Sequence, residues 1–127
     1  MADRNELEQG DRFMPRFDGN GLIVATVTDA DGGAVLMTAW MNREAIDHTF
    51  ATGRVTFWSR SRQALWTKGE TSGHFLSLVE MRVDCDQDSL WIVARPAGPV
   101  CHTGASGCFY RAVDAGGGLR AVGPAEV

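Results

Sequence analysis

The sequence has no apolar run long enough to cross a membrane and no apolar segment near its start. A membrane-spanning helix needs roughly 18 consecutive apolar residues, and no stretch of this 127-residue chain approaches that length. A secretory signal needs an apolar core, whereas residues 1–13 (MADRNELEQGDRF) are rich in charge. We therefore predict a cytoplasmic protein with no membrane partner.

Positive charge is also in deficit. Twelve Lys and Arg residues stand against sixteen Asp and Glu residues, which gives a formal net charge of −4. A general nucleic-acid binder neutralises phosphates with a basic surface, so we predict no nucleic-acid partner. The chain also lacks the motif G-x-x-x-x-G-K-[ST], which excludes a P-loop.

Cysteine is scarce and odd in number, with only Cys85, Cys101 and Cys108. Without an export signal, an odd count argues against a disulfide framework. The C-x15-C-x6-C spacing lacks the closely paired cysteines of a zinc finger. Three thiolates with no fourth would leave a coordination position for water, as in a catalytic zinc site. The alternative is that these thiols only pack in the core.

The length and an ordinary composition, 44% hydrophobic and 22% charged, favour a single globular domain over residues 1–127. We expect its core within about residues 17–113. Residues 1–12 are polar and residues 114–127 are rich in glycine. We expect both segments to be peripheral or flexible tails.

Residues 21–41 read as a β-hairpin, because two β-rich apolar runs flank the turn residues 29–33. Asn42 can cap a following helix that runs to about Thr52, where Gly53 can end it. Further strands are expected at residues 54–59, 74–84, 89–96 and 108–113. The predicted fold class is α+β, predominantly antiparallel, with one main helix after the first hairpin.

Three aspartates alternate with other residues in the segment VDCDQDSLW (residues 83–91). If strand alternation continues past Val83, Cys85 stays on the apolar face and the aspartates share the opposite face. Carboxylates suit Mg²⁺ or Ca²⁺ and thiolates suit Zn²⁺. An EF-hand loop is excluded, because Ser89 and Arg95 occupy the places that need glycine and glutamate. The alternative is a solvated acidic turn. The aspartates are Asp84, Asp86 and Asp88.

The segment CHTGASGC places His102 directly beside Cys101. Adjacent side chains of an extended chain point apart, so the two would rarely bind the same ion. A neutral histidine near a metal-bound water could act as a general base. The alternative is a histidine in a surface loop.

The segment WSRSRQALWTKGETSG (residues 58–73) combines basic and hydroxyl side chains that suit an anionic ligand such as a phosphate. Trp58 and Trp66 could stack on a base, although core packing is the more common role of tryptophan. The alternative for the charges is a basic surface hairpin. The donors in this segment are Ser59, Arg60, Ser61, Arg62, Thr67, Lys68, Thr71 and Ser72.

Together with DCDQD and GPVCHTGASGCFY, this segment resembles the phosphoribosyl-AMP cyclohydrolase family of histidine biosynthesis, and the resemblance covers about residues 21–111. It is similar to the stand-alone form, with no fused pyrophosphohydrolase domain. The family implies hydrolytic opening of the adenine ring between N1 and C6 of 1-(5-phosphoribosyl)-AMP. It also implies an intertwined homodimer with shared active sites, whose zinc ligands come from both chains.

The resemblance further implies one Zn²⁺ per subunit on Cys85, Cys101 and Cys108, and one Mg²⁺ per subunit on Asp84, Asp86 and Asp88. His102 would transfer protons. Leu76 stands where the family often has glutamine, and Gly107 where it usually has serine; neither change removes a metal ligand. The expected substrate-binding residues are Trp58, Ser59, Arg60, Arg62, Lys68, Glu70, Thr71 and Ser72.

Two alternatives stay open from the sequence. Another zinc-dependent nucleotide hydrolase, such as a deaminase, would attack a similar ring carbon. The deaminase motifs H-x-E and P-C-x-x-C are both absent. The second alternative is a metal-binding module without catalysis, whose thiols only hold a dimer together.

Overall fold

The computed structural model describes residues 3–123. Its first two strands, β1 (Ile23–Asp29) and β2 (Val35–Met41), form the predicted hairpin. The amide of Gly33 donates to the carbonyl of Asp29 at 3.0 Å. Gly32 and Gly33 have φ values of 98° and 81°, a left-handed conformation that glycine adopts at little cost. The glycine pair therefore sets the turn.

Helix α2 (Arg43–Thr52) follows the hairpin directly, with the predicted bounds. The side chain of Asn42 accepts a hydrogen bond from the amide of Ala45 at 2.8 Å. Gly53 ends the helix with φ 72°. Both ends of α2 are thus set by local residues, as the sequence indicates.

The main sheet has the strand order β2-β1-β6-β5, where β5 spans Leu76–Val83 and β6 spans Ser89–Pro96. Its pairs are antiparallel except for β1 and β6, which run parallel. The fold is therefore α+β and mostly antiparallel, and the central parallel pair is an addition to the prediction. It arises because α2 and the segments after it carry the chain across one face before it rejoins the sheet.

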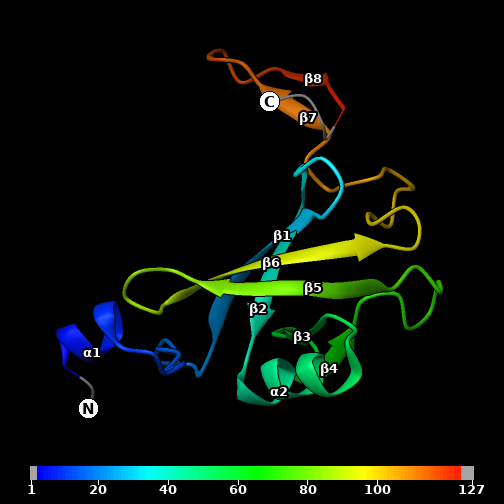
Figure 1. Cartoon of the computed structure of the whole chain (residues 1–127). Helices are drawn as coiled ribbons and strands as arrows, with labels where there is room; N and C mark the ends of the chain where they lie inside the picture. The colour runs from blue at the N-terminus through cyan, green and yellow to red at the C-terminus, as the bar shows by residue number, and fades with distance from the viewer. Residues whose placement is uncertain (1–2, 124–127) are drawn as a thin grey trace.

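One face of the sheet forms the core. Figure 1 shows α2 lying on the same side of the sheet as β3 (Thr56–Ser59) and β4 (Ala64–Thr67). Alternate residues of β1 and β6 point to this side and are buried, while Trp91 on the opposite face is 44% exposed. The side chains with almost no exposure include Ile23, Val27, Ile46, Phe57, Leu76, Leu90 and Ile92.

Strand β4 corrects the expectation of a polar loop after residue 59. It pairs antiparallel with β3, and Phe57 packs against Trp66 with ring centroids 5.4 Å apart. Only Leu65 and Trp66 carry the apolar signal in this short strand, which is too little for a periodic pattern.

The end segments also contain regular structure. Helix α1 (Arg4–Gln9) has no buried residue, and β7 (Arg111–Val113) pairs with β8 (Leu119–Ala121) in a hairpin that projects away from the sheet in Figure 1. Residues 1–2 and 124–127 of the two expected tails lie outside the described residues. Among residues 3–123, no helix combines the length and apolar character that crossing a membrane requires.

The alternation expected along β5 is interrupted by a bulge. The register against β6 shifts between Leu78 and Glu80, which leaves Val79 unpaired and 48% exposed. Met81 pairs with the buried Ile92, so it faces the core. Strict alternation along residues 74–84 would place Val79 on the same face as Met81 and Val83, and this expectation is wrong, because one extra residue in a strand reverses the alternation.

Candidate active site

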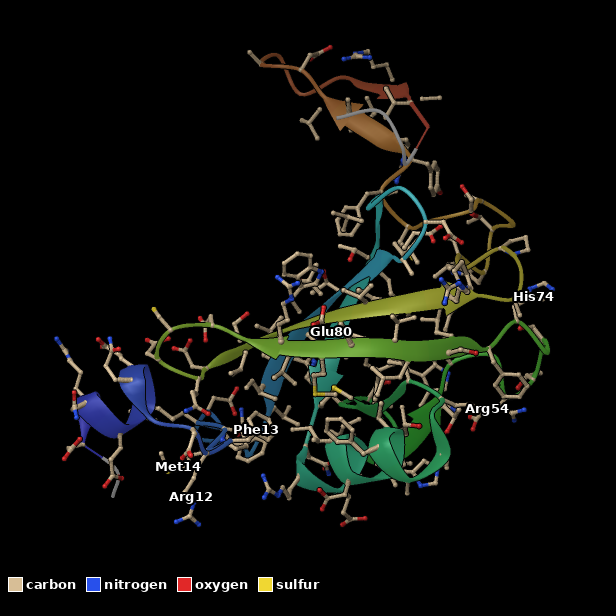
Figure 2. The ribbon with its side chains drawn as sticks, viewed as in Figure 1. Arg12, Phe13, Met14, Arg54, His74 and Glu80 are labelled. Atoms are coloured by element: carbon tan, nitrogen blue, oxygen red, sulfur yellow. The ribbon has the colours of Figure 1, made fainter. Side chains whose placement is uncertain are left out.

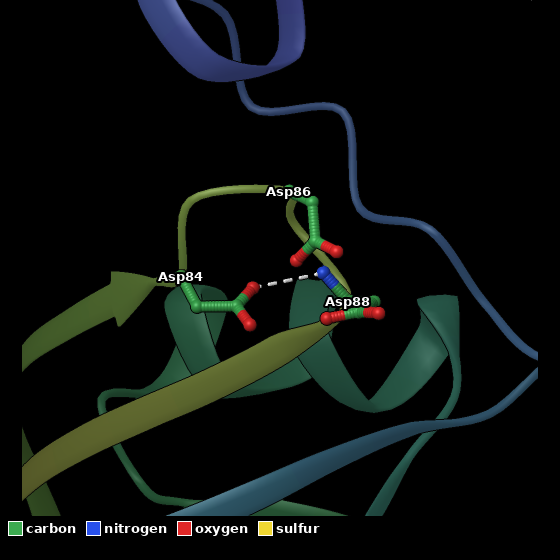
Figure 3. Close-up of side chains that lie close together, drawn as sticks. All are labelled: Asp84, Asp86 and Asp88. Carbon is green, nitrogen blue, oxygen red and sulfur yellow. Dashed lines mark hydrogen bonds between the residues drawn. The ribbon is translucent and has the colours of Figure 1, made fainter. Parts of the chain in front are cut away.

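The three aspartates lie in the tight turn that joins β5 to β6, and they converge there. The turn is closed by hydrogen bonds from Asp84 N to Ser89 O and from Gln87 N to Asp84 O, both 3.1 Å. One carboxylate oxygen of Asp84 also accepts from the amide of Asp88 at 3.0 Å (Figure 3). The same oxygen accepts from the amide of Ser89 at 3.1 Å. One ligand atom from each of the three carboxylates lies within 4.8 Å of the others.

This convergence has a different cause from the one predicted. The strand ends at Val83, so the aspartates do not share a face of an extended strand. The turn backbone brings them together instead, and their oxygens form a donor set that suits a hard divalent cation. Within residues 3–123, this is the one group of three or more candidate metal-binding side chains.

Crowding of the carboxylates affects the pKa of Asp88. The pKa of Asp88 is raised, first by hydrogen bonding of its carboxyl with Asp86, then by hydrogen bonding with Asp84, and further by desolvation and by the two like charges. A guanidinium nitrogen of Arg16 lies 4.0 Å from a carboxylate oxygen of Asp86. A bound cation would relieve the remaining repulsion between these carboxylates.

Two of the three thiols meet in the loop after β6. Cys101 is buried, and the hydroxyl of Thr103 donates to its sulfur at 3.1 Å. This contact is the main reason why the pKa of Cys101 is lowered. The pKa of Cys108 is raised, chiefly by desolvation and then by the charge of Cys101 and a hydrogen bond between the two thiols. Cys101 is therefore the more acidic of the two thiols.

The main-chain contacts of this loop anchor it to the sheet. The amide of Cys108 donates to the carbonyl of Leu36 in β2 at 2.7 Å, and the amide of Cys101 donates to Ala105 at 3.1 Å. Gly104 takes φ 93°, which allows the turn back to Cys101. His102 is exposed in the same loop. Its position beside Cys101 is set by sequence, and its side chain faces solvent.

Cys85 lies away from the other two thiols within one chain. It precedes β6 and is exposed, whereas Cys101 follows β6. The eight strand residues are joined by seven steps of about 3.3 Å each, which separate these ends by roughly 23 Å. Figure 2 shows the two ends of β5 far apart, with the labelled Met14 on the side where the strand ends and His74 beyond its start. A single chain therefore does not gather the three sulfurs.

The expected substrate residues fall into two groups. Trp58, Ser59 and Arg60 line a hollow of about 540 Å³ beside β2 and the β3–β4 hairpin. Trp40 lines it too, and the Arg60 guanidinium lies 5.0 Å from the centre of the Trp40 ring. Sequence reasoning missed Trp40, because a tryptophan in an apolar strand resembles a core residue. Arg62 lies in the adjoining turn, where its amide donates to the Ser59 hydroxyl at 3.2 Å.

The second group, which holds Lys68, Glu70, Thr71 and Ser72, occupies the loop between β4 and β5. The positive charge of Lys68 acts weakly on both thiols: it adds to the lowering of the Cys101 pKa, whose main cause is Thr103, and partly offsets the raised pKa of Cys108, whose main cause is desolvation. The turn requires Gly69, because a Cβ there would come within 2.4 Å of the main chain of His74. Glu70 accepts a hydrogen bond from the amide of Thr67 at 3.3 Å, which steadies the loop.

The position of Leu76 explains one departure from the expected family pattern. Its side chain is fully buried at the start of β5. An amide side chain there would need a buried partner, so leucine fits this core.

Comparison with known proteins identifies the family of this chain. A model of the phosphoribosyl-AMP cyclohydrolase family matches residues 37–110, more than half of the chain. The phosphoribosyl-AMP cyclohydrolase of Sphingopyxis alaskensis is 65% identical over 109 residues, covering 86% of each chain. That of Brucella canis is 56% identical over 123 residues, covering 95% of this chain and 88% of its own. The chain therefore belongs to the phosphoribosyl-AMP cyclohydrolase family.

Proposed function

We propose that the protein hydrolyses 1-(5-phosphoribosyl)-AMP in L-histidine biosynthesis, opening the adenine ring at the N1–C6 bond. The observation that carries this proposal is the 65% identity to a phosphoribosyl-AMP cyclohydrolase over 86% of both chains. The clustering of thiols, carboxylates and phosphate-binding side chains in this chain supports it.

The ring-opening chemistry follows from the substrate. A ribose phosphate on N1 makes the adenine ring electron-poor, so hydroxide adds readily to C6. The N1–C6 bond then breaks, and N1 receives a proton. C6, which keeps its amino group and the added oxygen, becomes the carbonyl carbon of a carboxamide. The product is an aminoimidazole carboxamide ribotide with a formimino bridge. One water is consumed and no redox partner is needed.

A zinc site is proposed at Cys101 and Cys108 of one chain with Cys85 of a second copy. The donor set fits, because soft thiolates suit zinc and Cys101 and Cys108 lie in the same loop, where each affects the pKa of the other. The roughly 23 Å along β6 supports a shared site in a homodimer, because Cys85 cannot join the pair within its own chain. Zinc bound there would supply hydroxide at neutral pH, since it lowers the pKa of water to about 7.

Magnesium is proposed at Asp84, Asp86 and Asp88, whose oxygen donors suit a hard cation. Its charge would neutralise or orient a substrate phosphate. His102 would move the proton between the attacking water and N1, since it is exposed beside Cys101 and an imidazole has one nitrogen that can accept a proton and one that can donate it.

The remaining residues would bind the substrate. Arg60, Arg62 and Lys68 carry the positive charge that the two phosphates need. Trp58 lines the same hollow as Arg60 and offers a face for the base. The hydroxyls of Ser59, Thr71 and Ser72 would complete the phosphate contacts, and Glu70 would hold the Lys68 loop. As an enzyme of amino-acid biosynthesis, the homodimer would work in the cytoplasm.

Turnover tests the proposal directly. Purified protein supplied with Zn²⁺ and Mg²⁺ should convert phosphoribosyl-AMP into the ring-opened product, which is followed by its absorbance. A deaminase would instead release ammonia and leave the ring closed, and a non-catalytic metal module would do neither. Absence of ring opening with both metals present would overturn the proposal.

A further inference from the structure

Gln87 stands at the centre of the aspartate turn and is only 4% exposed, although it lies between Asp86 and Asp88. Its backbone has φ 61°, a left-handed conformation that is uncommon for residues other than glycine. Such a conformation persists when its surroundings hold it in place. The contacts of the Gln87 side chain supply that restraint.

These contacts run to the N-terminal strap, which we define as residues 7–16. The Gln87 side-chain oxygen accepts from the amide of Met14 at 2.7 Å. Its side-chain nitrogen donates to the carbonyls of Leu7 and Arg12, at 3.1 and 3.2 Å. The main-chain carbonyl of Gln87 accepts from the amide of Arg16 at 2.7 Å.

No other residue shares this role within the described chain. Every hydrogen bond that joins residues 3–16 to the rest of residues 3–123 involves Gln87. Helix α1 contributes no buried residue to hold the strap. One further polar contact, the Arg16–Asp86 ion pair at 4.0 Å, reaches the same turn. Figure 3 shows the strap passing beside Asp86 and Asp88.

We propose that Gln87 is a positioning residue that couples the N-terminal strap to the aspartate turn, so that the strap holds the three carboxylates in the conformation that binds a divalent cation. This inference rests on the cation site of the proposed function. Asp86 and Asp88 are bonded directly to Gln87, so the left-handed backbone at Gln87 fixes the directions in which both carboxylates leave the turn. Release of the Gln87 side chain removes the restraint on that backbone.

The coupling is reciprocal, because two sites that share one conformational equilibrium affect each other equally. A cation bound to the carboxylates stabilises the binding conformation of the aspartate turn, and this in turn stabilises the contacts between Gln87 and the strap. Conversely, a strap attached through Gln87 stabilises the same conformation of the turn and thereby raises its affinity for the cation.

The test uses full-length protein, Mn²⁺ as the cation and electron paramagnetic resonance to measure free Mn²⁺. Gln87→Met keeps the length and neutrality of the side chain but removes its three hydrogen bonds. We expect about tenfold weaker Mn²⁺ binding, together with faster tryptic cleavage after Arg12. Gln63→Met is the matched control, because Gln63 also has a left-handed backbone, φ 51°, but donates only to the nearby Arg60 carbonyl. The control should change neither quantity.

The wild-type protein provides a second test that needs no folded Gln87 variant. Mn²⁺ should slow tryptic cleavage after Arg12 in the wild type but not in Asp86→Asn. The coupling would be overturned if Gln87→Met bound Mn²⁺ with unchanged affinity. It would also be overturned if Mn²⁺ did not change the rate of tryptic cleavage after Arg12 in the wild type. If either result is found while the protein still opens the ring normally, only the coupling is contradicted and the proposed function stands. If the coupling is found but the ring is not opened, only the proposed function is contradicted.

Discussion

Thr49 in α2 and Thr56 at the start of β3 are joined by a fully buried hydrogen bond, in which the amide of Thr56 donates to the Thr49 hydroxyl at 2.9 Å. The same hydroxyl donates to the carbonyl of Ala45 at 2.8 Å. This pair fastens the helix to the hairpin that carries Trp58 and Arg60. The helix therefore helps to fix one wall of the hollow lined by Trp58 and Arg60.

Thr49→Val should lower the free energy of unfolding by about 1–3 kcal/mol, because it keeps the side-chain shape but leaves the buried Thr56 amide without a partner. Urea unfolding followed by circular dichroism measures the change. Thr52→Val is the control: its hydroxyl is exposed, so water can replace its contacts and the loss should be clearly smaller. Equal losses in the two variants would contradict the role assigned to Thr49.

Cys101→Ser and His102→Ala should separate metal binding from proton transfer. Cys101→Ser should lose both zinc and turnover, because a thiolate ligand is removed. His102→Ala should keep its zinc and lose roughly 10²-fold or more in kcat, the usual contribution of a positioned acid–base group. Zinc content by atomic absorption and kcat on the same preparations give the result. Normal turnover by His102→Ala would show that another group transfers the proton.

Subunits with complementary cysteine changes should restore activity when they are mixed. In a hybrid of Cys85→Ser and Cys101→Ser chains, one of the two shared sites is intact. Random pairing makes half of the dimers hybrids, so about a quarter of the wild-type rate should return. Mixing Cys101→Ser with Cys108→Ser is the control, because both changes fall in one loop and no hybrid site is complete. Recovery in the control, or none in the first mixture, contradicts a site shared between chains.

Asp88→Asn should raise Tm in the metal-free protein. The raised pKa of Asp88 means that its carboxyl group binds a proton more tightly in the folded state than in the unfolded state. The associated stability is present at low pH and is lost as pH rises through the folded-state pKa, so the carboxylate destabilises the fold at neutral pH. The neutral asparagine removes this repulsion.

The same substitution should reduce the rise in Tm that Mg²⁺ produces, because a cation ligand is lost. Thermal unfolding at pH 7 with chelator and with Mg²⁺ measures both effects. Asp31→Asn, an exposed change in the β1–β2 turn, should alter neither. A metal-free Asp88→Asn protein less stable than the wild type would refute the account of carboxylate crowding.

Local features of the fold were predictable because nearby residues determine them. Asn42 and Gly53 set both ends of α2, and the glycines at 32 and 33 set the first hairpin turn. Strand β4 was not predictable, since its pairing with β3 matters more than its own weak pattern. The bulge at Val79 has no distinctive local residue either, because it depends on the register against β6.

The sequence by itself determined which residue types are available for chemistry: three thiols, an aspartate triplet, and a basic, hydroxyl-rich segment. It also determined the ends of α2, through bonds that span only a few residues. The tertiary structure alone decided how those groups meet. It brought the three aspartate carboxylates together in one turn, and it placed Gln87 in hydrogen-bonding contact with the N-terminal strap.

The structure also placed Cys85 and the Cys101–Cys108 pair at opposite ends of β6. The physical reason is that each of these juxtapositions depends on strand register and on contacts between distant segments. Such contacts form only when the core packs, and no local pattern encodes them.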